Sequence, residues 1–217
     1  MSKANELVYV ADPMCSWCWG FSPVVKSIVN HFADRAPVAV IAGGLAPDTT
    51  EPMDERARSV VREHWDHVHE ATGQPFDYGF FERHQFVYNT ELPCRALISA
   101  RMLQPDLALT FLNHLHAAFY RDNRDITNAA TLCDLAVTCG LDPGQFAQAL
   151  HGEETLQATQ RDFGLSRAMG IIGFPSLIGN DGERLTVISI GYRPWESVER
   201  FIDMWLTTGI KSTSSGR

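Results

Sequence analysis

The strand-forming segments of this chain lie near its two ends, and a long region with helical patterning separates them. Residues 7–11 and 38–42 are short apolar runs with many β-branched side chains, which is typical of buried strands. Between them a helical pattern of apolar residues starts at Pro23, with Ser22 as its candidate N-cap. Because parallel strands need a crossover connection, this order predicts a right-handed βαβ unit.

The middle of the chain predicts helices, and the C-terminal part predicts a β-hairpin followed by a helix. No convincing strand pattern occurs between residues 48 and 170. Residues 175–179 and 185–190 predict two strands joined by an Asn-Asp-Gly turn, and a final amphipathic helix starts near Pro194. The helices of the middle region are expected at residues 53–72, 93–104, 106–120, 127–139, 143–150 and 153–169.

Two cysteines stand where the first predicted strand gives way to helix. The segment 12–18 has the sequence DPMCSWC, so Cys15 and Cys18 are three positions apart. Thiols at this spacing can close into a small disulfide ring, and a helix N-terminus stabilises the thiolate of the first one. The segment therefore predicts a redox-active dithiol. Cys15 is expected to be the nucleophile, and Cys18, one turn further into the helix and more shielded, the resolving thiol.

The order βαβ, helical block, ββα is that of an α/β thioredoxin-like fold with a large all-helical insertion. Together with the CSWC sequence and with GFPS at residues 173–176, it resembles the DsbA-type thioredoxin-like family, in its cytoplasmic branch of predicted protein disulfide oxidoreductases and isomerases. The expected thioredoxin-like domain comprises residues 5–47 and 157–209, and the expected helical insertion domain comprises 48–156. The Ser-rich segment 211–217 predicts a disordered tail.

The resemblance implies further site residues. In such proteins a cis proline faces the dithiol, and the residue before it offers its backbone to an extended substrate. Phe174 and Pro175 match this position, so both are expected to bind substrate, with the Phe174 ring narrowing the groove beside Cys15. Trp17 is expected to form an apolar lip for peptides. Many members carry an acidic residue six positions before the first cysteine, whereas this chain has Tyr9 there.

Two residues close to the cysteines are candidate accessories. Asp12 could accept or relay a proton during exchange, although an Asp before a proline is also a common turn residue. Ser16, with Trp17, leaves the segment between the cysteines without a cation. Because a cation there would stabilise the thiolate, its absence argues against an extremely strong oxidant.

A second resemblance concerns residues 89–95. This stretch is similar to one in kappa-class glutathione transferases and 2-hydroxychromene-2-carboxylate isomerases, which bind glutathione beneath the helical domain. It makes Asn89 and Arg95 possible accessory residues and glutathione a possible co-substrate. Those relatives typically carry an active-site serine and no second cysteine, so the retained Cys18 favours disulfide exchange. Cys94 could be a third redox thiol or, more typically, a buried core residue.

A metal site is the weaker interpretation of the cysteine and histidine pattern. Zinc held by a Cys-x-x-Cys pair normally takes a second closely spaced Cys or His pair, which the other three cysteines do not supply. His64, His67 and His69 alternate with acidic residues in a segment typical of a solvated helix face. We therefore expect no metal.

Charge and hydrophobicity exclude two classes of partner. The formal net charge is −8, whereas non-specific nucleic-acid binding needs a basic face. No segment approaches the roughly 20 apolar residues of a membrane span, and the polar N-terminus lacks the apolar core of a secretory signal. We expect a cytoplasmic protein that binds neither nucleic acid nor membrane. The oligomeric state stays open.

The sequence thus predicts a thiol-disulfide oxidoreductase, similar to DsbA and protein disulfide isomerase, that exchanges disulfides with protein, peptide or small thiol substrates without a bound cofactor. One alternative is a glutathione-dependent transferase or isomerase acting on a small molecule. Another is a non-enzymatic binding module whose partner depends on redox state. The direction of exchange stays open, because it depends on the potential of the dithiol relative to its compartment.

Overall fold

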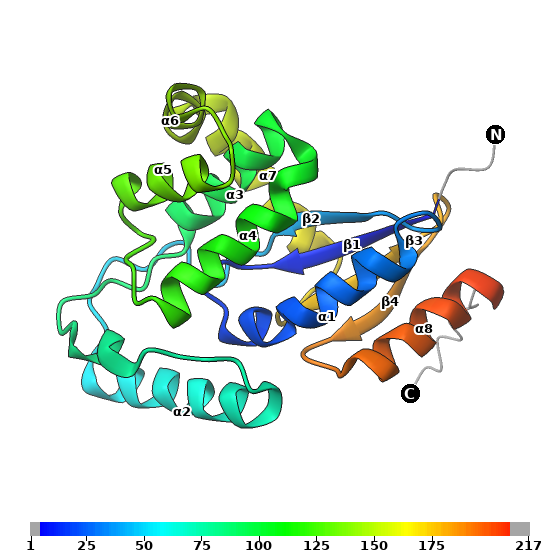
Figure 1. The fold of residues 1–217 in the computed structure, drawn as a ribbon, viewed down its shortest axis with the longest axis horizontal. Helices are drawn as coiled ribbons and strands as arrows, with labels where there is room; N and C mark the ends of the chain where they lie inside the picture. Colours follow the sequence, from blue (N-terminus) through cyan, green and yellow to red (C-terminus); the bar gives the residue numbers. More distant parts are fainter. Residues whose placement is uncertain (1–4, 209–217) are drawn as a thin grey trace.

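Four strands form one mixed sheet with helices packed around it (Figure 1). This computed structural model describes residues 5–208. The strand order is β2-β1-β3-β4. Strand β1 (Glu6–Ala11) is parallel to β2 (Val38–Ala42) and antiparallel to β3 (Ser176–Asn180), and β3 is antiparallel to β4 (Leu185–Ile190). The predicted α/β thioredoxin-like fold is confirmed.

The helices occupy the predicted regions, with end points that differ by one or two residues in most cases. Short 3-10 segments, η1 (Tyr78–Glu82) and η2 (Pro105–Leu107), and a π-helical segment, η3 (Ala117–Arg121), lie among them. The α-helices are α1 (Ser16–Phe32), α2 (Glu55–Thr72), α3 (Glu91–Leu103), α4 (Ala108–His116), α5 (Ala129–Thr138), α6 (Pro143–His151), α7 (Glu153–Ala168) and α8 (Trp195–Thr208).

The first helix begins seven residues earlier than the sequence predicts. The expectation that it starts at Pro23 with Ser22 as N-cap is wrong, because α1 begins at Ser16 and Pro23 lies inside it. Proline lacks the N–H that would bond the carbonyl four residues earlier. That carbonyl, of Trp19, instead accepts hydrogen bonds from Ser22 Oγ at 2.8 Å and Gln74 Nε2 at 2.9 Å. The helix therefore runs through the proline, and its N-terminus lies at the cysteines.

The helix predicted over residues 106–120 is divided into η2, α4 and η3. In the π-helical segment the N–H of Asp122 donates to the carbonyl of Ala117, five residues earlier, at 3.0 Å. A periodic apolar pattern does not distinguish this ladder from an α-helical one, so the sequence could not show the change. This π-helical segment matters for the site because His116 is the residue directly before η3 and Tyr120 lies within η3.

The helical region and the sheet share one hydrophobic core. Helix α8 packs on β4 and against α1, whereas α3 and α7 pack on β2 at the other edge of the sheet (Figure 1). Phe21 of α1, Leu97 of α3 and Phe111 of α4 all belong to the same buried cluster. The domain boundary predicted between residues 156 and 157 falls inside α7, so this division stays a prediction. The tail predicted at 211–217 lies outside the described residues.

Candidate active site

The dithiol lies where β1 passes into α1. Cys15 is the N-cap residue of the helix, with an extended backbone (φ −93°, ψ 113°), and both Cys15 and Cys18 are free thiols. The N–H of Cys15 donates to the carbonyl of Asp12 at 3.1 Å, and the N–H of Cys18 donates to the carbonyl of Cys15 at 3.0 Å. The Cys15 sulfur therefore lies at the positive end of the helix dipole, as the sequence predicts.

The two thiols differ in accessibility. Cys15 is 6% exposed and Cys18 is 0% exposed. Burial raises the pKa of the Cys18 thiol well above its ordinary value, and the neighbouring Cys15 sulfur raises it further. Cys18 therefore keeps its proton at neutral pH, and Cys15 is the less deeply buried of the two residues. This asymmetry is what a nucleophile and a resolving thiol require.

The segment before β3 lies against Cys15. The Phe174–Pro175 peptide bond is cis, and the Sγ of Cys15 lies 3.6 Å from the carbonyl oxygen of Phe174. The backbone of Phe174 thus faces the dithiol. Its ring packs over Gly43, where a Cβ atom would come within 2.2 Å of it. The Phe174 ring lies against Gly43, the residue after β2, and its role in narrowing the groove beside Cys15 stays a prediction.

Asp12 is buried and ties three parts of the chain together. Its Oδ1 accepts from the N–H of Met14 at 2.8 Å. Its Oδ2 accepts from the N–H of Leu45 at 2.7 Å and from the thiol of Cys94 at 3.3 Å. Burial raises the pKa of Asp12, and the hydrogen bonds from Leu45 and Met14 partly offset this. The carboxyl group holds the loop that carries Cys15 against the loop after β2 and against α3.

Cys94, the candidate third redox thiol, is 0% exposed. Burial raises its pKa well above the ordinary value, and the neighbouring Asp12 raises it further. Cys133 and Cys139, on and just beyond α5, are partly exposed. The buried Cys94 thiol is a hydrogen-bond donor to the active-site loop.

The helical region contributes three residues that the sequence analysis missed. The hydroxyl of Tyr88 donates to the carbonyl of Met14, and the hydroxyl of Tyr120 lies 3.5 Å from that of Tyr88. The Nε2 of His116 lies 3.1 Å from the carbonyl of Asp12. Burial raises the pKa of both tyrosines. The sequence signal for His116 and Tyr120 was a polar group within the helix predicted over residues 106–120. Tyr88 lies in a stretch to which no element was assigned.

Trp17 and Ser16 lie between the two cysteines. Trp17 is partly exposed, and its ring centroid lies 5.8 Å from that of Tyr192. The two rings pack against each other at the start of α1, and the role of Trp17 as a lip for peptides stays a prediction. Ser16 is largely buried, at 9% exposure.

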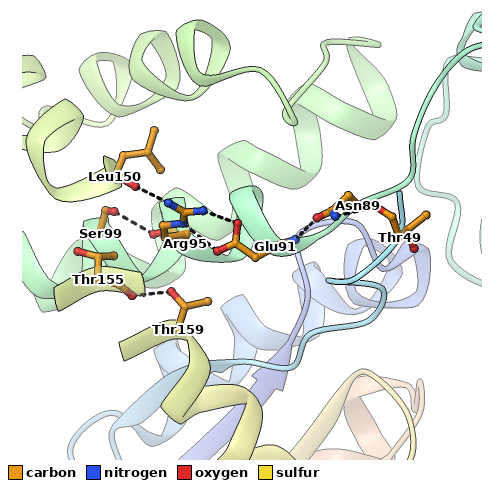
Figure 2. Close-up of polar contacts among 8 residues, drawn as sticks. All are labelled: Thr49, Asn89, Glu91, Arg95, Ser99, Leu150, Thr155 and Thr159. Carbon is orange, nitrogen blue, oxygen red and sulfur yellow. Dashed lines mark hydrogen bonds and ion pairs between the residues drawn. The ribbon is translucent and has the colours of Figure 1, made fainter. Parts of the chain in front are cut away.

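Asn89 and Arg95 take part in contacts within the helical region (Figure 2). The side chain of Asn89 donates to the carbonyl of Thr49 at 2.8 Å and accepts from the N–H of Glu91 at 2.8 Å. Arg95 forms two hydrogen bonds with the Glu91 carboxylate and lies 3.4 Å from the carbonyl of Leu150. The structure does not bring these two side chains into contact with the dithiol, and their accessory role stays a prediction.

Among residues 5–208, no group of three or more His, Cys, Asp or Glu side chains could hold a metal ion. His64, His67 and His69 lie exposed on α2. None of the helices described for residues 5–208 combines the length and the apolar character that crossing a membrane demands.

Comparison with known proteins shows the family. A family model described as thioredoxin matches residues 8–190. One similar crystal structure is named as that of a candidate protein disulfide isomerase from Nitrosomonas europaea. Its sequence is 35% identical and its TM-score is 0.88, and the match covers 94% of this chain and 98% of that chain. The cytosolic disulfide reductase DsbM from Pseudomonas aeruginosa is 25% identical with a TM-score of 0.77, and 93% of this chain covers 98% of it. A second DsbM structure is with GSH.

Curated relatives carry a different name. The ClpXP adapter protein SpxH from Bacillus subtilis is 23% identical over 176 residues, which are 81% of this chain but 58% of SpxH. The chain thus spans less than two thirds of this relative's length. The thioredoxin match and the structural neighbours agree with the strand order of the sheet. Because the family model matches most of its length, the chain belongs to the thioredoxin family.

Proposed function

We propose that this protein is a thiol-disulfide oxidoreductase, of the disulfide reductase or isomerase kind, that works in the cytoplasm. The observation that carries the proposal is the pairing of Cys15, which keeps 6% exposure and lies against the Phe174 carbonyl, with a Cys18 that is 0% exposed. Such a pair can hold a substrate sulfur briefly and then release it. The 35% identical structure named for disulfide isomerase and the cytosolic reductase DsbM support this assignment.

In the reducing direction, the Cys15 thiolate attacks one sulfur of a substrate disulfide. A Cys15–substrate disulfide forms, and the other substrate sulfur leaves as a thiolate that takes up a proton. Cys18 then loses its proton and attacks the Sγ of Cys15, which closes the Cys15–Cys18 disulfide and releases the second substrate thiol. Two electrons pass from the dithiol to the substrate. Oxidation of a substrate dithiol is the same sequence in reverse.

The surroundings of Cys15 favour an extended peptide as substrate. The backbone at Phe174 faces the reacting sulfur, so a peptide that lies along it can form main-chain hydrogen bonds. Two large apolar side chains on the neighbouring segments are exposed: Ile172, two residues before Phe174, at 90%, and Leu45, two residues after the Gly43 that the Phe174 ring contacts, at 46%. Together with Trp17 they offer contact to apolar residues on either side of a substrate cysteine. Glutathione fits the same backbone as a short thiol peptide, which the DsbM structure with GSH supports.

A redox-dependent binding module is the second candidate function. The name of the curated relative, ClpXP adapter protein SpxH, favours it. In this alternative the same exposed surface around Cys15 would bind one protein partner, and closing the Cys15–Cys18 disulfide would change that surface. The partner would be held without repeated turnover.

The test is the full-length protein with an insulin-disulfide reduction assay driven by glutathione. We expect Cys15→Ser to abolish the reaction and Cys18→Ser to accumulate mixed disulfides, because the resolving step is lost. Cys133→Ser, which changes a cysteine on α5, is the control and should keep the wild-type rate. Full activity of Cys15→Ser would refute the proposal.

Two further outcomes separate the rival functions. Saturable glutathione binding with small-molecule turnover that survives Cys18→Ser would instead indicate a transferase or isomerase. Negligible turnover of the wild type, together with a protein captured in only one redox state, would indicate the binding module.

A further inference from the structure

Strand β4 carries a row of exposed apolar side chains, which we call the β4 row. Its members, with their exposed fractions, are Leu185 (54%), Val187 (57%) and Ile190 (41%). In the pairing with β3 they lie opposite Asn180, Ile178 and Ser176, which alternate along β3 and therefore share one face of the sheet. A β-bulge in this pairing brings Ile190 onto that face, although it is three positions after Val187.

The same face of the sheet is covered over the other three strands. Its apolar residues there form a buried cluster of Val8, Val10, Ile41 and Ile178. The segment between α7 and β3 packs on this cluster through Met169, Ile171 and Phe174. The β4 row extends this apolar face sideways, and its side chains are exposed instead of buried.

The two edges of the sheet also differ in their cover. At the β2 edge, Arg101 of α3 donates to the carbonyl of Val40 at 2.7 Å. On the same strand, Asp162 of α7 accepts from the N–H of Ala42 at 2.8 Å. Among residues 5–208, β4 is the last strand at the other edge, so one side of its backbone pairs with β3 and the other side has no strand beside it. Such an edge is a template for an added strand.

Helix α8 packs on β4 without covering the β4 row (Figure 1). Ile188 of β4 and Ile202 of α8 belong to the main buried cluster, on the opposite face of the sheet. The β4 row therefore combines an unpaired strand edge with exposed apolar side chains. Both features favour contact with an extended apolar chain.

The β4 row begins beside the proline segment of the candidate active site. The N–H of Gly191 donates to the carbonyl of Pro175 at 2.7 Å. Ile190 lies opposite Ser176, the residue that follows the cis proline. From Ile190 to Leu185 the row extends about 17 Å, at roughly 3.4 Å per residue, away from the dithiol. Glutathione is a tripeptide and is too short to cover this length, whereas a polypeptide substrate can.

We propose that the β4 row is a second docking site for polypeptide substrates of the dithiol, where an apolar segment of about six residues joins β4 as an added strand. The inference rests on the proposed function and names its substrate class, which is disulfide-bearing polypeptides in an unfolded, extended state. Unfolded chains expose the backbone groups and apolar side chains that β4 can bind. A second copy of this chain is disfavoured as the occupant, because each copy carries a net charge of −8.

The first experiment compares a polypeptide disulfide with a small one. The reduced full-length protein is oxidised in a single turnover by isolated insulin B chain that carries its own intrachain disulfide, or by glutathione disulfide. The second-order rate constants of the two reactions are measured. Val187→Lys places a charge in the middle of the β4 row, so we expect the B-chain rate constant, divided by that for glutathione disulfide, to fall at least about fivefold.

Two further variants make this comparison sharp. Val137→Lys is the matched control, because Val137 is 53% exposed on α5 and its substitution adds the same charge. Its ratio of rate constants should equal that of the wild type. Val187→Thr keeps a β-branched side chain and should lower the ratio about twofold. Lysine is common on exposed strand edges, so Val187→Lys should fold, and circular dichroism checks this.

The second experiment measures docking without thiol chemistry. Insulin B chain whose thiols have been blocked with iodoacetamide is purified and titrated into the isotope-labelled full-length protein, and binding is followed by NMR. We expect the amide signals of Val187 and Ile190 to shift saturably, with a dissociation constant on the order of 1 mM. Val187→Lys should weaken this binding at least about fivefold.

The outcomes distinguish failure of this proposal from failure of the proposed function. Binding of the blocked chain at β4 without disulfide exchange by the wild type would refute the proposed function and support the docking surface. Exchange at Cys15 with an unchanged ratio for Val187→Lys and no shift of the β4 amides would overturn the docking site and leave the proposed function standing. Shifts of the same amides when the protein is concentrated without peptide would assign the β4 row to a second copy and overturn the proposal.

Discussion

The Sγ of Cys15 lies 3.6 Å from the carbonyl oxygen of Phe174, a residue 159 positions further along the chain. Strand pairing produces this approach. Val10 of β1 is in register with Ser176 of β3, so the segments that follow β1 and precede β3 meet at the same end of the sheet. In the sequence, the whole helical region lies between Cys15 and Phe174. The distance between the Cys15 sulfur and the Phe174 carbonyl therefore depends on how the Phe174 side chain packs.

The first prediction concerns that packing. A Cβ atom on Gly43 would lie within 2.2 Å of the Phe174 ring, so Gly43→Ala must displace the ring and with it the carbonyl beside Cys15. We expect the kcat/KM for disulfide exchange to fall about tenfold, because small displacements of positioning groups lower rates strongly. Stability should fall by about 1–3 kcal/mol, as for other overpacked sites. Enzyme kinetics and thermal unfolding measure the two effects.

Gly164→Ala is the matched control for this substitution. Gly164 lies inside α7, and a Cβ atom there meets nothing within 4 Å. Replacing a helical glycine with alanine stabilises by up to about 1 kcal/mol. We therefore expect Gly164→Ala to keep full activity at equal or higher stability. Equal kinetics for the two variants would show that Phe174 does not position substrate through its contact with Gly43.

The second prediction concerns thiol reactivity. Burial raises the pKa of Cys18 and of Cys94 well above the ordinary value, so neither forms much thiolate at neutral pH. Iodoacetamide should therefore modify Cys15 rapidly in the native protein and leave Cys18 and Cys94 unmodified, as measured by peptide mass spectrometry. In urea all the cysteines should react at similar rates. Rapid native modification of Cys94 would support its role as a third redox thiol.

The third prediction concerns the two tyrosines behind the dithiol. Tyr88→Phe removes the hydrogen bond to the Met14 carbonyl and should destabilise by about 1 kcal/mol, with a several-fold loss of exchange rate. The hydroxyls of Tyr88 and Tyr120 are 3.5 Å apart, so Tyr120→Phe should cost less in the Tyr88→Phe background than alone. Denaturant unfolding of the single and double variants measures the coupling. Strict additivity would show that the two hydroxyls act independently.

The parts of the fold and site that could be predicted depend on local patterns. The strand at residues 7–11 and the pair Cys15 and Cys18 could be located because apolar runs and thiol spacing are local properties. The start of α1 was misplaced because Pro23 normally opens a helix, whereas here Ser22 and Gln74 satisfy the carbonyl that it leaves unpaired. Gln74 reaches this carbonyl only through tertiary folding.

The residues of the helical region that contact the active-site loop could not be predicted either, because their contacts form only through tertiary folding. Tyr88 and His116 contact the loop before Cys15 through its backbone carbonyls, and a backbone contact leaves no residue pattern in the sequence. Asn89 and Arg95 were proposed from the resemblance alone, and their side chains bond within the helical region. A resemblance transfers a position, but the partners of a side chain depend on packing that differs between relatives.

The last prediction is a pH dependence of stability that arises from His116. Burial lowers its pKa from the ordinary 6.5 to about 4. Because the folded pKa is the lower one, the unfolded chain binds this proton first as pH falls. The stability linked to His116 is therefore fully present above about pH 6.5 and is lost between there and about pH 4. At 1.36 kcal/mol per unit of pKa, the loss is on the order of 3 kcal/mol.

His116→Gln tests this prediction, because glutamine can still donate to the Asp12 carbonyl but does not titrate. Between pH 7 and pH 4 the free energy of unfolding, measured in urea, should fall by about 3 kcal/mol more for the wild type than for the variant. Asp12 acts in the opposite sense, since burial raises its pKa and its contribution to stability grows as pH falls. Asp12 is present in both proteins, so its effect cancels in the difference between the two curves. Parallel curves for the two proteins would show that His116 is not held neutral in the folded state.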